Sequence, residues 1–451
     1  MAKAICTIKG TTAAKQYKKL TKETKMYLEE IKKEAQSIAR RLKKSALPKA
    51  AEVFEKCFPV TAETTVKTAS KDDTFLITGD IPAMWLRDST AQVVCYLPLA
   101  KQNADVADFI EGLCKRQFKC ICHDPYANAY NEREDGGHCN DDDNCDDPLI
   151  WERKYEVDSL CYAIKLCYDF YKVTGRRSHF DGTFFEGAKK ILTLFEKEQR
   201  HKELSDYKFI RPNTAEHDTM PKNGEGNPVG FTGMTWSGFR PSDDRCFYNY
   251  LIPSNMFAAV ELLHLAEIFE KIAKNGELSQ KCRTLSAEIR QGIKNYGCVV
   301  HENVGKMYAY ETDGLGNYIL SDDANVPSLL SAPYLGFCSK NDPVYEATRD
   351  FVLSKDNPFY FEGRYAKGVG SPHTPKSYVW HIALSMQGLT AKGKEEKLSL
   401  LKMLVSTTDG TDLMHEGFDA NDPSKYTRPW FAWSCSLFCE FVMHCLDQGV
   451  I

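Results

Sequence analysis

Helical periodicity runs through almost the whole chain and limits its fold more than any other feature of the sequence. Apolar residues recur three and four positions apart in about a dozen segments, which predicts helices with one buried face. These segments are residues 27–42, 53–58, 85–99, 106–118, 155–171, 184–195, 247–272, 285–296, 326–335, 378–389, 398–404 and 431–445. Strand-like pieces are few, and the best is residues 306–320, where Asp313-Gly314 and Gly316-Asn317 predict a small β-hairpin.

About a dozen helices without a large sheet can form a bundle, a superhelical solenoid or a closed toroid. A solenoid needs a repeat of about 30–50 residues, and the sequence contains no such repeat. The loops 77–89, 128–152, 224–244, 366–377 and 407–430 are long and rich in Asp, Arg, Trp, Pro and Gly, which is typical of binding sites. We therefore expect an all-α (α/α)6 toroid of helical hairpins whose loops converge on one mouth. Residues 1–451 should form a single domain, with residues 1–70, which carry no motif, as outer helices.

Composition excludes several classes of partner. The 58 basic and 62 acidic residues leave a net charge of −4, and no long basic block is present, so we expect no nucleic-acid partner. No apolar run reaches the length of a membrane span, and the first residues lack the apolar core of a signal peptide. The 17 cysteines are scattered and odd in number, which favours a reducing compartment. We expect a cytoplasmic protein without a membrane partner.

Four clusters combine acids, arginines and aromatic residues, the mixture that binds sugar hydroxyls and sugar faces. They are Thr78–Ser89, Trp151–Ser159, Met234–Asp244, and Met414–Phe418 followed by Lys425–Trp433. The first three precede predicted helices, so their acids could equally be helix caps or first-turn charges. Adjacent carboxylates such as Asp243 and Asp244 can also raise one pKa, as a general acid requires. Glu416 lies in an aromatic, glycine-containing loop with no helix to cap, and a base that activates water is a natural interpretation.

The sequence offers two candidate metal sites, a calcium loop and a zinc site. Residues 141–152 alternate acids as a calcium loop does, but Asp146 occupies the position that requires glycine, and Pro148 interrupts the loop. A zinc site could draw on a group of cysteines and histidines whose spacings match no standard pair of zinc ligands: Cys114, Cys120, Cys122, His123, His138, Cys139 and Cys145. We therefore expect neither a metal nor another cofactor.

The clusters, read together, resemble glycoside hydrolase family 125. The matching blocks run in order from about residue 74 to the C-terminus, and several are eight or more residues long. They are Met84–Ser89, Trp151–Tyr162, Ser237–Asp244, Asp322–Leu330, Trp380–Leu384 and Tyr426–Trp433. The resemblance implies an (α/α)6 fold and a metal-independent exo-α-1,6-mannosidase that inverts configuration and acts on mannose-containing oligosaccharides.

The resemblance also implies roles for individual residues. Asp243 would be the general acid and Glu416 the general base, with Asp244 as an alternative acid. The pocket for the terminal mannose would be lined by Trp85, Arg87, Asp88, Glu156, Asp158, Arg240, Asn325 and His381. The chain departs from the family pattern in the Cys- and Asp-rich insert 138–147, and at Ser434-Cys435, where Ala-Asn is expected.

Two other hypotheses fit the same residues. One is another toroidal carbohydrate enzyme, either an α-mannosidase of different linkage or a glycoside phosphorylase that depends on phosphate. The other is a non-catalytic sugar-binding protein, which the presence of both Asp243 and Glu416 disfavours. The sequence sets neither the oligomeric state nor the physiological glycan.

Overall fold

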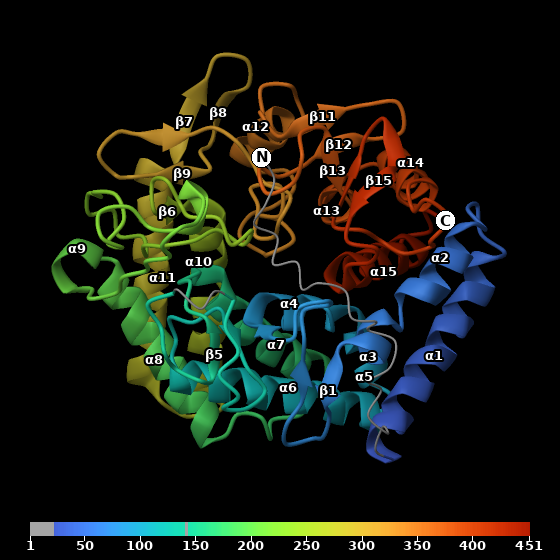
Figure 1. Cartoon of the computed structure of the whole chain (residues 1–451), viewed down its shortest axis with the longest axis horizontal. Coiled ribbons are helices and arrows are strands. Elements are labelled where there is room, and N and C mark those ends of the chain that lie inside the picture. Colours follow the sequence, from blue (N-terminus) through green and yellow to red (C-terminus); the bar gives the residue numbers. More distant parts are fainter. Residues whose placement is uncertain (1–21, 140–142) are drawn as a thin grey trace.

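The computed structural model describes residues 22–139 and 143–451, and helices dominate it (Figure 1). The N-terminal half contains α1 (Lys22–Leu42), α2 (Ala50–Cys57), α3 (Val60–Thr64), α4 (Leu86–Ala91), α5 (Leu97–Ala100), α6 (Ala104–His123), α7 (Val157–Thr174), α8 (Gly182–Glu198) and α9 (His201–Leu204). The C-terminal half contains α10 (Ile252–Lys271), α11 (Gly276–Tyr296), α12 (Pro343–Val352), α13 (His381–Thr390), α14 (Lys394–Ser406) and α15 (Ala432–Asp447).

The longer helices alternate between an inner and an outer ring, which confirms the predicted (α/α)6 toroid. The inner helices α4, α7, α10, α13 and α15 pack on one another, and α10, α13 and α15 are buried on most sides. The outer helices α6, α11 and α14 cover inner neighbours, and α8 packs beside α6. The sixth inner position, between α10 and α13, is filled by residues 321–337, a buried run of turns. The Tyr162 hydroxyl of α7 and the Tyr345 hydroxyl of α12 donate to its carbonyl oxygens.

Short antiparallel strands connect the helices. They pair as β1 (Val66–Thr68) with β2 (Phe75–Leu76), β7 (Cys298–His301) with β8 (Gly305–Tyr308), and β11 (Tyr360–Glu362) with β12 (Lys367–Val369). Three three-stranded sheets contain β3 (Met84–Trp85), β4 (Ala129–Tyr130) and β5 (Ile150–Glu152); β10 (Tyr318–Ile319), β9 (Glu311–Thr312) and β6 (Tyr250–Leu251); and β13 (Tyr378–Trp380), β14 (Gly417–Asp419) and β15 (Asp422–Thr427). The predicted hairpin is confirmed, with its turn between β9 and β10.

Two predicted helices differ in the structure. Residues 326–335 form turns, because the Asp322 carboxylate accepts hydrogen bonds from the backbone N–H groups of Leu329 and Leu330. Side-chain acceptors of this kind compete with helical hydrogen bonding. Residues 85–99 are divided into α4, a 3-10 turn at Val94–Tyr96 and α5, because Pro98 can occupy only the first turn of a helix.

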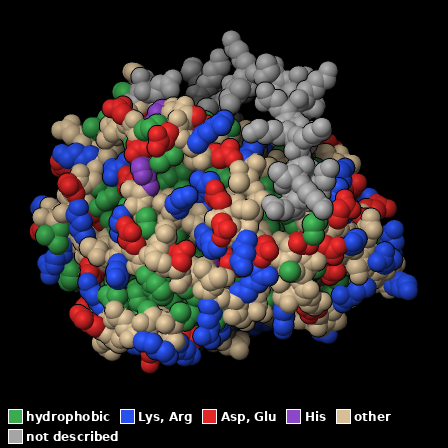
Figure 2. Space-filling model, turned by 90° about the horizontal axis from the view of Figure 1, so that it is seen from below, with side chains coloured by type: hydrophobic (Ala, Val, Ile, Leu, Met, Phe, Trp, Pro, Cys, Tyr) green, Lys and Arg blue, Asp and Glu red, His purple; other side chains and the backbone are tan. Residues whose placement is uncertain are grey.

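The two ends of the described chain meet and close the ring. Helix α15 packs against α2, α3 and α4, so the red and blue segments lie side by side in Figure 1. One large apolar core extends from Tyr27 to Cys445 and includes the buried indoles of Trp236, Trp380 and Trp433, and a small second cluster contains Trp85 and Trp151. Acidic and basic side chains are interspersed over the face drawn in Figure 2. In the two described ranges, no helix has the length and apolarity that a membrane span requires.

Candidate active site

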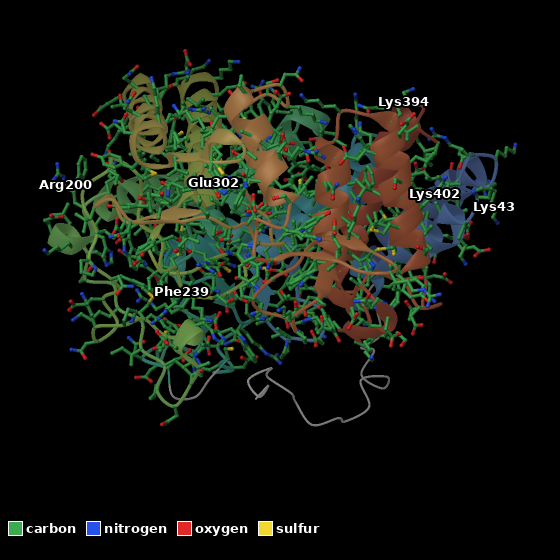
Figure 3. All side chains as sticks on the ribbon, turned by 90° about the horizontal axis from the view of Figure 1, so that it is seen from above. Lys43, Arg200, Phe239, Glu302, Lys394 and Lys402 are labelled. Atoms are coloured by element: carbon green, nitrogen blue, oxygen red, sulfur yellow. The ribbon has the colours of Figure 1, made fainter. Side chains whose placement is uncertain are left out.

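A cavity opens among the long loops and is lined by residues from several of them. Phe239 belongs to the loop that supplies Asp243, and Figure 3 shows it on the opposite side of the molecule from Lys394 at the start of α14. The cavity wall consists of Thr78, Ile81, Trp85, Arg87, Asp88, Pro241, Ser242, Asp243, Asn325, His373, Trp380, Glu416, Arg428 and Phe431. The loops that the sequence marks as chemically dense therefore converge on one site, with both predicted catalytic carboxylates in its wall.

Asp243 is held at the cavity by donors from three segments. Its Oδ1 accepts hydrogen bonds from Arg87 Nη2 at 2.9 Å, Trp85 Nε1 at 3.3 Å and Asn128 Nδ2 at 3.4 Å. Its backbone has φ = +67°, a left-handed conformation that is costly for a residue with a Cβ. The ammonium group of Lys154 donates to the Asp243 carbonyl oxygen at 2.7 Å. These contacts aim the carboxylate into the cavity.

Arg87 is the centre of a buried group of four carboxylates. Its guanidinium lies 2.7 Å from Asp88, 3.2 Å from Glu156, 3.5 Å from Asp158 and 2.9 Å from Asp243. Burial raises the pKa of both Asp88 and Asp158 to about 6, although Arg87 opposes the change. Burial also raises the pKa of Glu156 well above its usual range, with Arg87 again opposing and the charge of Asp243 reinforcing the shift.

The pKa of the Asp243 carboxyl group shifts in the opposite direction. Burial alone would raise its pKa, but Arg87, Lys154 and a hydrogen bond from Glu156 outweigh burial and lower it. In the free protein Asp243 is therefore ionised, whereas a general acid must hold a proton when substrate is bound. A proton that reaches Asp243 must come from a neighbouring group or from solvent.

Glu416 faces the same cavity from the loop before β14. Arg428 Nε donates to its Oε1 at 3.1 Å, and the same guanidinium pairs with Asp80. Arg428 also has a left-handed backbone, with φ = +55°. His381 lies behind this loop, where its Nδ1 accepts a hydrogen bond from the backbone N–H of His415 at 2.9 Å. Glu416 is thus a carboxylate oriented by one partly exposed cation.

Asp244, the alternative acid, has a different position from Asp243. Its carboxylate lies 3.4 Å from His373 Nδ1 and does not belong to the wall of the cavity. Burial lowers the pKa of His373, but the hydrogen bond and charge of Asp244, with the charges of Glu416 and Asp243, raise it overall to about 9. A cationic His373 therefore stands between the two predicted catalytic residues and Asp244.

The eight expected pocket residues divide into two groups. Trp85, Arg87, Asp88 and Asn325 line the cavity. The other four do not belong to its wall and have protein partners: Glu156 and Asp158 at Arg87, Arg240 at Glu311, and His381 at His415. Their contact with a sugar stays a prediction.

Sequence reasoning missed His373, Arg428 and Trp380 as cavity residues. Arg428 and Trp380 belong to two of the matching blocks quoted above, so their place in a block was an available signal. His373 lies outside every block, and only the fold brings it to Asp244.

Asp143 of the insert 138–147 is connected to Lys154, the residue that holds the Asp243 backbone, through Arg211 and Asp218. Asp143 forms a two-pronged ion pair with Arg211, at 2.5 Å and 2.6 Å, and Arg211 also reaches Glu152 and Asp218. Residues 140–142 of the insert, and hence part of the calcium-loop pattern at 141–152, lie outside the described residues. Over residues 22–139 and 143–451, His, Cys, Asp and Glu side chains nowhere gather in threes as a metal site would need.

Comparisons with known proteins identify the family of the chain. Residues 48–443 match the model of the family described as metal-independent α-mannosidases, glycoside hydrolase family 125. A Schizosaccharomyces pombe protein, the meiotically up-regulated gene 157 protein, is 37% identical in an alignment 421 residues long that covers 88% of this chain and 82% of that protein.

Solved structures give the same result. A metal-independent α-mannosidase of Streptococcus pneumoniae, in a non-productive complex with α-1,6-mannobiose, is 47% identical, with a TM-score of 0.88 over 95% of this chain and 99% of its own. A bacterial glucoamylase in complex with acarbose shares the fold at 13% identity, with a TM-score of 0.57 over 87% of this chain and 56% of its own. The chain belongs to glycoside hydrolase family 125, the metal-independent α-mannosidases.

Proposed function

We propose that the protein removes terminal α-1,6-linked mannose from the non-reducing end of oligosaccharides with inversion of configuration. Asp243 is the general acid and Glu416 the general base in this proposal. The observation that carries it is the position of both carboxyl groups in the wall of one small cavity, each oriented by its own arginine. The α-1,6-mannobiose bound to the 47% identical pneumococcal relative supports the choice of linkage.

The two environments suit two different tasks. Inversion requires a protonated carboxyl at the glycosidic oxygen and an ionised carboxylate that activates water on the opposite face, with the two carboxyl groups about 6.5–9.5 Å apart. Asp243 and three other carboxyl groups compete for one cation, Arg87, which favours a proton held within this group. Glu416 pairs with Arg428, whose guanidinium orients its carboxylate.

The cavity supports exo-action on one terminal sugar. Trp85 and Trp380 offer aromatic surface, and Arg87, Asp88 and Asn325 offer donors and acceptors for hydroxyl groups. Residues 22–139 and 143–451 share one apolar core, which supports our proposal that the chain acts as a single catalytic domain.

Hydrolysis of α-1,6-mannobiose in the presence of EDTA, followed by proton NMR of the first product, tests the proposal. We expect β-mannose from the wild type and at least a 100-fold loss of turnover in Asp243→Asn and Glu416→Gln. Asp244→Asn is the matched control and should keep far more activity than Asp243→Asn. Release of α-mannose first, or full activity of either catalytic variant, would contradict the proposed mechanism.

A further inference from the structure

Two carboxyl groups at the site share the same donors. Arg87 Nη2 donates to Glu156 Oε1 at 3.2 Å and to Asp243 Oδ1 at 2.9 Å. Asn128 Nδ2 donates to the same two oxygens, at 3.3 Å and 3.4 Å. The two oxygens therefore lie against the same two nitrogen atoms, which makes the carboxyl groups close neighbours. Like charges this close oppose ionisation of both carboxyl groups, so Glu156 and Asp243 form a pair that holds one proton.

The charge balance around the pair points the same way. The groups that face Glu156 come from α4, from α7 itself, from the segment 128–154 and from the loop before β6: Arg87, Asp88, Asp158, Ser159, Asn128, Glu152, Lys154 and Asp243. Arg87 serves four carboxyl groups, while Lys154 is already paired with Asp218. Several uncompensated anions in a buried site would be very costly, so at least one carboxyl group is protonated.

The two members of the pair differ in exposure. The side chain of Glu156 is 0% exposed, whereas that of Asp243 is 31% exposed and opens into the cavity. Water therefore stabilises the charge on Asp243 but not on Glu156, and the proton rests on Glu156 in the free protein. A sugar bound in the cavity displaces that water, which removes the preference and favours transfer of the proton to Asp243.

We propose that Glu156 holds the proton that Asp243 delivers to the glycosidic oxygen, so that the two carboxyl groups act together as one acid. This inference rests on the proposed function of Asp243. The O–H bond of Glu156 breaks as one forms on Asp243, and Asp243 then gives that proton to the leaving oxygen while the C1–O bond breaks. Glu416 takes a proton from the water whose hydroxyl group adds to C1. The proton that Glu416 later releases to solvent balances the proton that the pair takes up.

Ser159 offers a gentle way to alter the pair. Its hydroxyl donates to Glu156 Oε2 at 2.7 Å, whereas the donors shared with Asp243 contact Oε1. The bond from Ser159 favours the ionised form of Glu156. Ser159→Ala should therefore make the pair hold its proton more tightly. Glu156→Gln has the opposite effect: its amide can still donate to Asp243 but carries no transferable proton.

The experiment measures kcat/KM against pH for two substrates, α-1,6-mannobiose and α-mannosyl fluoride. Departure of fluoride needs little help from an acid, so only the first substrate reports on the proton. With mannobiose, Glu156→Gln should move the basic limb to lower pH and lower kcat/KM at pH 8 by about 100-fold or more. With the fluoride the loss should be under about 10-fold. Ser159→Ala should move the basic limb of the mannobiose profile to higher pH, by about one pH unit.

Two controls make the result decisive. Glu156→Asp keeps a protonatable carboxyl and should retain more of the mannobiose activity than Glu156→Gln. Asp158→Asn removes a carboxylate from the same guanidinium, and its loss should be equal for the two substrates. Equal losses on both substrates in Glu156→Gln, or an unmoved limb in Ser159→Ala, would overturn the inference even where Glu156→Gln folds poorly. Full mannobiose activity in Asp243→Asn would instead overturn the proposed acid itself.

Discussion

Lys154 is the residue whose loss should most clearly separate positioning of the acid from stability of the fold. Its side chain is 3% exposed, and its ammonium group donates to the Asp243 carbonyl oxygen at 2.7 Å and to Asp218 at 2.6 Å. The left-handed backbone of Asp243, with φ = +67°, costs about 1–3 kcal/mol and needs surrounding contacts to persist. Lys154→Met removes one of these contacts without adding bulk.

The structure sets the size of the effect. A hydrogen bond from a charged donor contributes about 1.5–3 kcal/mol, which corresponds to about 10- to 150-fold in kcat/KM if it holds the acid in the transition state. Removing one partner of a buried ion pair costs about 3–5 kcal/mol of stability. Arg211 also pairs with Asp218 and Glu152, so these carboxylates keep a cation when Lys154 is lost. The free energy of unfolding should therefore fall by about 3 kcal/mol, the lower end of that range.

The assay is kcat/KM on α-1,6-mannobiose together with unfolding in urea. Lys165→Met is the matched control, because Lys165 is also ion-paired and its side chain is only 15% exposed, but its partner is Asp169 and it lies away from the cavity. We expect both variants to lose stability and only Lys154→Met to lose at least 10-fold in kcat/KM. Lys154→Met with reduced stability and wild-type kcat/KM would refute the idea that this contact positions Asp243.

Three further variants test other parts of the site and core. Arg428→Met should lower kcat on mannobiose by about 10- to 100-fold, because Glu416 loses the donor at 3.1 Å that orients it; Arg428→Lys should lose less. His373 has a pKa raised to about 9 from 6.5, so its contribution to stability is complete below pH 6.5 and is lost as the pH rises through 9. His373→Gln should therefore flatten the decline of the urea midpoint over that range, and an unchanged slope would contradict the ion pair. Gly388→Ala should lower the free energy of unfolding by about 1–3 kcal/mol, because the new Cβ would overlap the ring of Phe441, whereas helix propensity alone favours Ala by about 1 kcal/mol.

The inner and outer helices could be predicted because burial dictates their sequence pattern. Helix α6 carries apolar residues at helical spacing over its whole length, and α7 ends at Gly175, which adopts the left-handed conformation common after a helix. Helix α12 is short and was not predicted, although Asp342 followed by Pro343 is a recognised start signal; the Asp342 carboxylate caps the helix by accepting from Val344 and Tyr345. The turns at 326–335 could not be predicted, because Asp322 competes for their backbone groups only once the segment is buried.

The candidate site was predictable where its residues cluster in the sequence. Trp85, Arg87 and Asp88 are neighbours in one motif, and all three line the cavity. His373 was not predictable, because its partner Asp244 is 129 residues away and no local pattern links them. Burial behind the wall, as for Glu156, also leaves no sequence signal, since a carboxylate at the start of a helix looks the same whether it faces solvent or a guanidinium.

The arrangement around Arg87 argues that acid catalysis belongs to a cluster and not to a single side chain. Buried ion pairs are weak sources of stability, so four carboxyl groups around one guanidinium need a functional explanation. Three of them come from the first turns of inner helices α4 and α7 or from the cap of α7, where the helix dipole favours negative charge and the fold fixes their positions. Asp243 comes instead from a loop and is the most exposed member of the group. We therefore propose that the fixed members set the affinity of the site for a proton and that the loop member, Asp243, presents that proton to the substrate.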